Sequence, residues 1–202
     1  MPTRAKEIHK IKHITTKARE RQNGHKGMVV WLTGLPASGK STIAQELEHD
    51  LFKNGIKTYI LDGDQLRKGL SMDLAYTIED RMENVRRAGE VAKFFREAGF
   101  VVICAFISPD LSVRQRIRSC FEFGDFIEVF VDCPVDICER RDPKGLYAKV
   151  RKGEIKNFTG ISAPYEKPLN PEIHLKTNVL SIRQSVNMIK KYLKSRAGLT
   201  HV

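Results

Sequence analysis

The sequence predicts one α/β domain, built on a mainly parallel sheet with helices on both faces. Short apolar runs alternate along the chain with segments whose apolar residues recur at helical spacing, which is typical of strand–helix–strand units. The 202 residues, 41% of them hydrophobic and 29% charged, suit a single soluble domain with a sizeable core. No apolar run approaches the roughly 20 residues that cross a bilayer, so we expect no membrane partner.

The alternation places each expected strand and helix in turn. Five short apolar runs are predicted to form strands: Met28–Thr33, Thr58–Leu61, Phe100–Ala105, Phe126–Val131 and Ile173–Lys176. Segments with helical periodicity are predicted to form helices: Ile43–Phe52, Ile78–Ala98, Val113–Arg118, Pro134–Arg141 and Ile182–Tyr192. Asn54-Gly55 and Gly99 end the first two helices. The result is a three-layer arrangement of helices, sheet and helices.

Two stretches fall outside this alternation. Residues 142–172 are rich in Gly, Pro and Lys and show little periodicity. A connection of that length is too long to be passive, so we expect a functional lid. Residues 1–27 are polar and poor in large apolar groups. They predict a basic N-terminal arm ahead of a domain that covers residues 28–202.

The net charge of +11 is located at the two ends of the chain. Residues 1–27 hold eight Lys or Arg and two Glu, a net of +6, and residues 181–202 hold five Lys or Arg and no acid. Residues 28–180 balance, with 22 basic and 22 acidic side chains. A nucleic-acid reader more often carries its excess on the folded face that binds, so we expect no nucleic-acid partner. Solvated ends explain the charge, with attraction of polyanionic substrates or of a partner as the alternative.

The cysteines and the N-terminus bear on the compartment. The four cysteines show neither a CxxC pair nor zinc-like spacing. We expect them to be reduced, with Cys104 in the core, and a regulatory disulfide is the alternative. The N-terminus lacks the apolar segment of a secretory signal. We therefore place the protein in the cytoplasm.

Residues 34–41 carry the chemistry. Their sequence, GLPASGKS, fits the phosphate-binding P-loop pattern GxxxxGK[ST] at every fixed position, between an expected strand and an expected helix. The two glycines let backbone N–H groups approach phosphates, and the positive end of the helix points at the same place. We expect Lys40 to span the β- and γ-phosphates of ATP and Ser41 to ligate Mg²⁺. The predicted ATP-binding residues are Gly34, Leu35, Pro36, Ala37, Ser38, Gly39, Lys40, Ser41 and Thr42.

Two carboxylates, Asp62 and Asp64, follow the second strand. They lie at the carboxyl edge of the sheet, where ligands bind in open α/β folds. Beside a P-loop, Asp62 can help to hold Mg²⁺, through water or directly, or accept the proton of an acceptor hydroxyl. A turn with a helix cap is the alternative reading. The NKxD signature of GTPases is absent, and a compact domain with a lid is typical of small-molecule kinases.

Nine blocks of residues in this order make the chain resemble the adenylylsulfate kinase (APS kinase) family. They are NGHKG at 23–27, WLTGL at 31–35, LDGD at 61–64 with Arg67, EDRMENVRR at 79–87, AFISP at 105–109, CERRD at 138–142, KGLYAK at 144–149, GEIKNFTG at 153–160 and PYEKPLNP at 164–171. The similarity covers about residues 23–176. It implies a stand-alone P-loop kinase that phosphorylates the 3′-hydroxyl of adenylylsulfate, and it implies a homodimer.

The resemblance also implies the acceptor site and a lid contribution. The implied acceptor residues are Asp64, Arg67, Tyr76, Arg81, Asn84, Ile107, Ser108, Lys144 and Phe158. Lys144 and Phe158 would come from the lid, with Phe158 and Tyr76 stacking on the acceptor adenine. Tyr76 stands where Phe is commoner in the family, and it can still stack. Ser108 matches a serine that the family's descriptions give as a phosphoserine intermediate.

Elementary chemistry supports several of these roles. Arginine offers planar charged forks for the oxygens of a phosphosulfate anion, and Arg81 and Asn84 are three apart on one helix. Phe158 stands in a polar stretch with no obvious core to join, which favours stacking. Phosphoryl transfer depends mainly on positioning and charge neutralisation. We therefore predict that Ser108 hydrogen-bonds the substrate and is not a nucleophile.

Two other functions compete with this interpretation. Another small-molecule kinase, for a nucleotide or a sugar, would not require the Phe158 lid or the Arg81 and Asn84 pair. A non-catalytic P-loop sensor would bind ATP tightly without turnover, and its basic ends would give steeply salt-dependent binding to nucleic acid.

Overall fold

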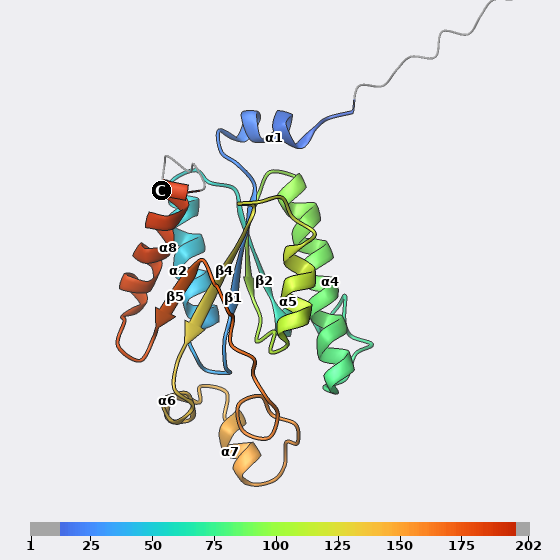
Figure 1. Cartoon of the computed structure of the whole chain (residues 1–202), viewed down its shortest axis with the longest axis vertical. Helices are drawn as coiled ribbons and strands as arrows, with labels where there is room; N and C mark the ends of the chain where they lie inside the picture. Colours follow the sequence, from blue (N-terminus) through green and yellow to red (C-terminus); the bar gives the residue numbers. More distant parts are fainter. Residues whose placement is uncertain (1–12, 197–202) are drawn as a thin grey trace, which may run out of the picture.

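A five-stranded parallel sheet forms the centre of the molecule in the computed structural model, which describes residues 13–196 (Figure 1). The strands are β1 (Met28–Thr33), β2 (Thr58–Asp62), β3 (Val101–Ala105), β4 (Phe126–Asp132) and β5 (Ile173–Lys176). Their order across the sheet is β2-β3-β1-β4-β5, and every neighbouring pair is parallel. All five predicted strands are confirmed, with bounds that differ by at most one residue. Because β1 is central, the loop that leaves it lies mid-sheet.

Eight helices accompany the sheet within the described residues. They are α1 (Thr16–Asn23), α2 (Lys40–Lys53), α3 (Gly63–Leu66), α4 (Ile78–Glu97), α5 (Leu111–Arg118), α6 (Val135–Arg141), α7 (Leu146–Arg151) and α8 (Ile182–Arg196). The five predicted helices are confirmed as α2, α4, α5, α6 and α8. The sequence analysis does not predict the short helices α1, α3 and α7.

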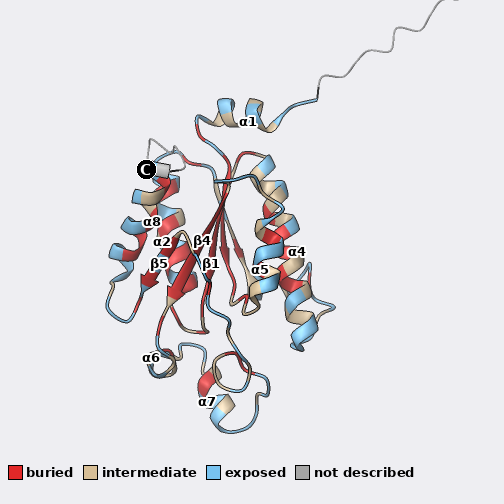
Figure 2. Ribbon diagram, viewed as in Figure 1, coloured by how far each residue is buried: buried red, intermediate tan, exposed pale blue. Residues whose placement is uncertain are grey.

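Two cores lie on opposite faces of the sheet, which gives the predicted three layers. Alternate residues of the strands face opposite sides, as the pleat requires. Val30 and Leu32 of β1 join the core under α2 and α8, whereas Val29 and Trp31 join the core under α4 and α5. Figure 2 shows that the strands are mostly buried, whereas the helices combine buried and exposed residues. Cys104 is fully buried in the second core, as predicted.

The predicted N-terminal arm contains a helix close to the domain. Residues 1–12 of that arm lie outside the described residues, but Thr16–Asn23 form α1. Thr15 caps its N-terminus, and Gly24, with φ of 74°, ends it. The Asn23 side chain donates to the carbonyl of Gly99 at 3.0 Å. The arm is therefore helical over part of its length, which the sequence analysis does not foresee.

Among residues 13–196, no helix has both the length and the apolar character needed to cross a bilayer.

Candidate active site

The P-loop connects the end of β1 to the start of α2 in the middle of the sheet. A Cβ at Gly34 would lie 2.3 Å from the carbonyl oxygen of Val131, so only glycine fits there. Gly39 has a φ of 104° and immediately precedes α2. The backbone N–H groups and the positive end of α2 thus point to one place, which suits phosphate. Ser41 and Thr42 are exposed on the first turn of α2.

Other P-loop residues are held by segments that follow β4. The carbonyl of Pro36 accepts a 3.0 Å hydrogen bond from the hydroxyl of Tyr147. The carbonyl of Ser38 accepts one of 2.8 Å from the hydroxyl of Thr177. Ala37 is held at a φ of 59°, which is unusual for a residue with a Cβ. Hydrogen bonds from Tyr147 and Thr177 thus hold the conformation of the P-loop.

The side chain of Lys40 is buried and folded back onto its own loop. Its Nζ donates to the carbonyls of Gly34 at 2.9 Å and Leu35 at 2.7 Å. Burial lowers the pKa of Lys40 to about 8, because the ammonium is desolvated and faces neutral carbonyls. The negatively charged oxygens of a triphosphate would stabilise the Lys40 ammonium better than these neutral carbonyls do.

Asp62 performs two functions at the end of β2. Its Oδ1 accepts from the backbone N–H of Asp64 at 2.9 Å and caps α3. Its Oδ2 accepts from the hydroxyl of Ser41 at 3.1 Å. The helix cap is therefore confirmed, and Asp62 also contacts the P-loop serine, while its role as a ligand stays a prediction. Carboxylate and hydroxyl oxygens are the ligands that Mg²⁺ prefers, so this pair fits the ion expected with ATP.

Arg67 and Tyr76 form a stacked pair near this edge. The guanidinium carbon of Arg67 lies 4.4 Å from the centre of the Tyr76 ring, and its Nη1 donates to the carbonyls of Leu74 and Ala75. The Tyr76 side chain is 66% exposed. A large aromatic ring held in solvent by an arginine is suited to stacking on a planar ligand.

Arg81 and Asn84 come from the first turns of α4. Arg81 donates to the carbonyl of Tyr76 at 3.0 Å and to the hydroxyl of Thr159 at 3.1 Å. Burial, followed by the nearby charge of Arg67, lowers its pKa from the ordinary arginine value. The buried Oδ1 of Asn84 has no hydrogen-bond partner among the described residues. Such an orphaned oxygen costs stability unless a ligand donates to it.

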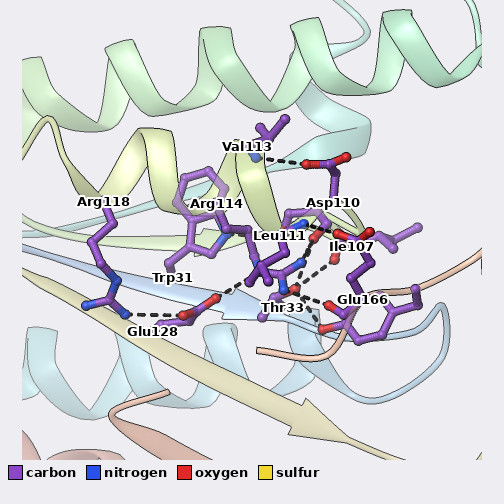
Figure 3. Close-up of polar contacts among 12 residues, drawn as sticks. Trp31, Thr33, Ile107, Asp110, Leu111, Val113, Arg114, Arg118, Glu128 and Glu166 are labelled. Carbon is purple, nitrogen blue, oxygen red and sulfur yellow. Dashed lines mark hydrogen bonds and ion pairs between the residues drawn. The ribbon is translucent and has the colours of Figure 1, made fainter. Parts of the chain in front are cut away.

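A cavity adjoins Arg81. Its walls come from α4, from the loop after β3 and from residues 157–166; they include Ile78, Arg81, Val85, Ser108 and Thr159. Ser108 is buried, and its Oγ accepts from the indole N–H of Trp31 at 3.1 Å. The carbonyl of Ile107 accepts from the hydroxyl of Thr33 at 2.8 Å, and several of these residues are drawn in Figure 3.

The predicted lid residue Lys144 reaches the sheet edge, but Phe158 corrects one argument made from the sequence. Lys144 forms an ion pair with Asp64, which raises the pKa of Lys144. Phe158 is buried and contacts the ring of Tyr147 at a centroid distance of 4.9 Å. It belongs to a small core with Cys133 and Cys138. The prediction that Phe158 has no core to join is therefore wrong, and its stacking on a ligand stays a prediction.

A buried charged group beside the site, Arg114, was not predicted from the sequence. Arg114 lies on the predicted helix Val113–Arg118, for which no burial was predicted; it is 1% exposed and pairs with the buried Glu128 of β4. A lone glutamate within the apolar run Phe126–Val131 was the available signal, because a buried carboxylate needs a cationic partner. Arg141 was also missed. It donates to the carbonyl of Thr177 at 2.5 Å beside the P-loop.

The predicted residues thus gather into three contact groups at one edge of the sheet. The P-loop with Lys40 forms the first, and Ser41 with Asp62 the second. Some of the predicted acceptor residues form the third, as the pair Asp64–Lys144 and the chain Arg67–Tyr76–Arg81. The other predicted acceptor residues, Asn84, Ile107, Ser108 and Phe158, make no direct side-chain contact with these five among the interactions of the described residues. Each group follows the carboxyl end of a parallel strand or lies beside one.

Known proteins match this chain over most of its length. A sequence model of the family described as "Adenylylsulphate kinase" matches residues 26–176. An adenylyl-sulfate kinase of Thermodesulfovibrio yellowstonii is 54% identical over 187 residues, 93% of this chain and 94% of the relative. An APS kinase of Mycobacterium tuberculosis, solved in complex with AMPPNP and APS, superimposes with a TM-score of 0.80 at 44% identity. That alignment covers 85% of this chain and 99% of the other.

A second similar structure, described as a hexameric APS kinase from Thiobacillus denitrificans, is 29% identical with a TM-score of 0.64. It covers 88% of this chain and 31% of its own. The family match spans the P-loop, the Asp62 and Asp64 edge, and the residues of the predicted lid. On this sequence match and on the shared fold, the chain belongs to the adenylylsulfate kinase family.

Proposed function

We propose that this protein transfers the γ-phosphate of ATP to the 3′-hydroxyl of adenylylsulfate, giving 3′-phosphoadenylylsulfate and ADP, a step of sulfate activation. One observation carries the proposal. A P-loop with its Ser41–Asp62 oxygen pair shares one sheet edge with two arginines and the orphaned amide oxygen of Asn84. The first part suits magnesium and ATP, and the second suits an anionic nucleotide.

The donor half uses the groups around the P-loop. Lys40 leaves the carbonyls of Gly34 and Leu35 and donates to the β- and γ-phosphate oxygens. Ser41 and Asp62 would hold Mg²⁺, which when bound neutralises charge on those phosphates. Asp62 is also the candidate to accept the proton of the attacking hydroxyl. The backbone N–H groups of the loop orient the triphosphate.

The acceptor half uses the arginines and the lid. Arg67 and Arg81 bind the phosphosulfate oxygens as charged forks. The buried Asn84 Oδ1 accepts from the acceptor, which removes its desolvation cost. Tyr76 and Phe158 stack on the adenine, with Lys144 and Asp64 contributed from the lid and from the sheet edge. The segment 142–172 would act as the lid of a kinase domain that covers residues 28–202.

Ser108 is proposed to position substrate together with Ile107. Its Oγ already accepts the Trp31 indole N–H, and its own O–H remains a donor. In-line attack by the acceptor hydroxyl needs no enzyme nucleophile. An acid-stable phosphoserine at Ser108, formed and consumed at the catalytic rate, would contradict this role.

Assembly and compartment are separate proposals. We propose a homodimer, following the family resemblance, and a cytoplasmic location. Sedimentation at equilibrium distinguishes a dimer from a monomer or a hexamer, and fractionation of the source cells tests the location.

The decisive experiment measures ADP formation from Mg²⁺-ATP with adenylylsulfate, against AMP, gluconate and no acceptor. We expect turnover that depends on adenylylsulfate and a product phosphorylated at the 3′ position. Lys40→Ala should abolish this turnover while its circular dichroism matches that of the wild type. Turnover with another acceptor only would favour a different small-molecule kinase. ATP binding without any turnover would favour a sensor.

A further inference from the structure

The loop after β3 is held in a conformation that its own residues do not favour. Ser108 has a φ of 38°, in the left-handed region that residues with a Cβ rarely adopt. This loop presents Ile107 and Ser108, which the proposed function assigns to the acceptor. Contacts from outside the loop must therefore over-determine its shape.

Arg114 makes those contacts. Its side chain is 1% exposed, and each of its three nitrogens donates to a different segment (Figure 3). Nη1 donates to the carbonyl of Ser108 at 2.5 Å and Nη2 to the carbonyl of Glu166 at 2.6 Å. Nε donates to the Glu128 carboxylate at 2.9 Å, which compensates the buried charge. A planar, permanently charged fork is needed to reach all three.

Glu166 ties the same two segments together from the other side. Its backbone N–H donates to the carbonyl of Pro109 at 2.9 Å. Its Oε2 accepts from the backbone N–H of Leu111 at 2.6 Å. Residues 107–111 and the part of the predicted lid around Glu166 thus form one hydrogen-bonded unit, with the Arg114 guanidinium at its centre.

We propose that Arg114 is a positioning residue for phosphoryl transfer. It fixes the Ser108 loop against the part of the predicted lid around Glu166, so that these two segments present one rigid wall to the acceptor. The inference deepens the proposed function and rests on it for the identity of the acceptor. The tether itself can be tested without any substrate, because Trp31 is the only tryptophan in the chain and donates to Ser108 Oγ.

Arg118 supplies a matched control. It lies one turn later on α5 and also donates to Glu128, at 3.2 Å, but its other bonds go to Glu172 and not to the loop. Arg114→Lys and Arg118→Lys both weaken the ion pairs around Glu128. Only Arg114→Lys removes the two-carbonyl bridge between Ser108 and Glu166.

The first readout is the Trp31 indole N–H resonance of the unliganded protein. We expect Arg114→Lys to move this resonance and Arg118→Lys to leave it near the wild-type position. The second readout is kinetic. Arg114→Lys should lower kcat/KM for adenylylsulfate about 100-fold, since a displacement of an ångström can have that effect, while the Kd for ATP stays within about twofold.

A second variant covers the case in which Arg114→Lys does not fold. Arg114→Met combined with Glu128→Met leaves no unpaired charge in the interior, so folding is expected to survive. The carbonyl tether is absent in this variant, and the same two changes are expected. An unmoved indole resonance, or acceptor kinetics equal to those of Arg118→Lys, would overturn the proposal. If the wild type does not use adenylylsulfate, the proposed function fails, whereas the indole readout still decides the tether.

Discussion

We predict that the ammonium of Lys40 changes its surroundings when a triphosphate fills the P-loop. Without nucleotide it is buried against the carbonyls of Gly34 and Leu35, and desolvation lowers its pKa to about 8. Phosphate oxygens stabilise the charged form, so binding of ATP raises this pKa. Between about pH 8 and the higher pKa of the complex, the nucleotide-bound protein then holds more protons than the free protein.

This difference predicts proton uptake on nucleotide binding. At about pH 8.5, binding of Mg²⁺-ATP should take up a fraction of a proton, and at about pH 6.5 almost none, because Lys40 is then protonated in both states. Calorimetry in two buffers of different ionisation enthalpy measures the uptake. Lys40→Met should show none of this component. Heats that do not depend on the buffer at the higher pH would contradict the assignment.

Asp62 and Arg114 differ in how much of their structural role the sequence predicts. Two interpretations were open for Asp62, a helix cap and a ligand beside the P-loop. One of its oxygens caps α3, which confirms the first, whereas the other accepts from Ser41 and the ligand role stays a prediction. By contrast, the burial of Arg114 was not predicted. A basic residue on an amphipathic segment looks solvated until the strand opposite it is known to bury a carboxylate, as Glu128 does.

The elements divide according to how much apolar surface they bury. The strands and the longer helices were predictable because each contains enough apolar residues to show a strand or helix pattern. The helix α1 buries no residue and is defined by its caps, Thr15 and Gly24, so periodicity could not reveal it. The lid helix α7 has six residues, and its buried Tyr147 packs against residues far along the chain. The apolar residues of the small core around Tyr147 and Phe158 are irregularly spaced along the sequence, so periodicity did not predict this core.

Phe158 allows the two possible roles of the lid core to be separated. Phe158→Leu keeps an apolar side chain of similar reach but loses the aromatic face. If Phe158 stacks on the acceptor adenine, KM for adenylylsulfate should rise about tenfold, since stacking of a base on an aromatic ring contributes about 1–3 kcal/mol. The melting temperature should change little.

The matched control for that experiment is Tyr147→Phe. It keeps the ring contact with Phe158 and removes only the hydrogen bond to the Pro36 carbonyl. Its KM for adenylylsulfate should stay within about twofold of the wild-type value. A lower melting temperature for Phe158→Leu with unchanged KM would assign Phe158 to the core alone.

At the scale of the whole molecule, the described parts of both basic ends lie opposite the site. Figure 1 places α1 and the end of α8 at one end of the sheet, and α6 and α7 at the other. Lys191 and Lys194 are exposed on the last turns of α8. The preceding residue, Lys190, pairs with Asp50, which lies ten residues after Lys40 on α2, and ten helical residues span about 15 Å. This separation from the P-loop exceeds the screening distance of about 8 Å at physiological salt.

This arrangement favours solvated ends over attraction of substrate. We predict that Lys191→Gln combined with Lys194→Gln leaves kcat/KM for adenylylsulfate within about twofold at both low and moderate salt. Arg67→Gln, a charge change within the proposed site, serves as the comparison and should cause a large loss. A salt-dependent loss in the α8 variant would restore the steering interpretation.

The same separation has a practical side. Since α1 begins and α8 ends at the end of the sheet remote from α7 (Figure 1), attachment to a bead or sensor chip at the start of α1 or at the end of α8 would leave the proposed active site facing the solution. Preparations immobilised at either of these two places are expected to turn over at equal rates. Random coupling through surface lysines would also modify Lys144, a residue of the proposed acceptor site, and is expected to lower the turnover.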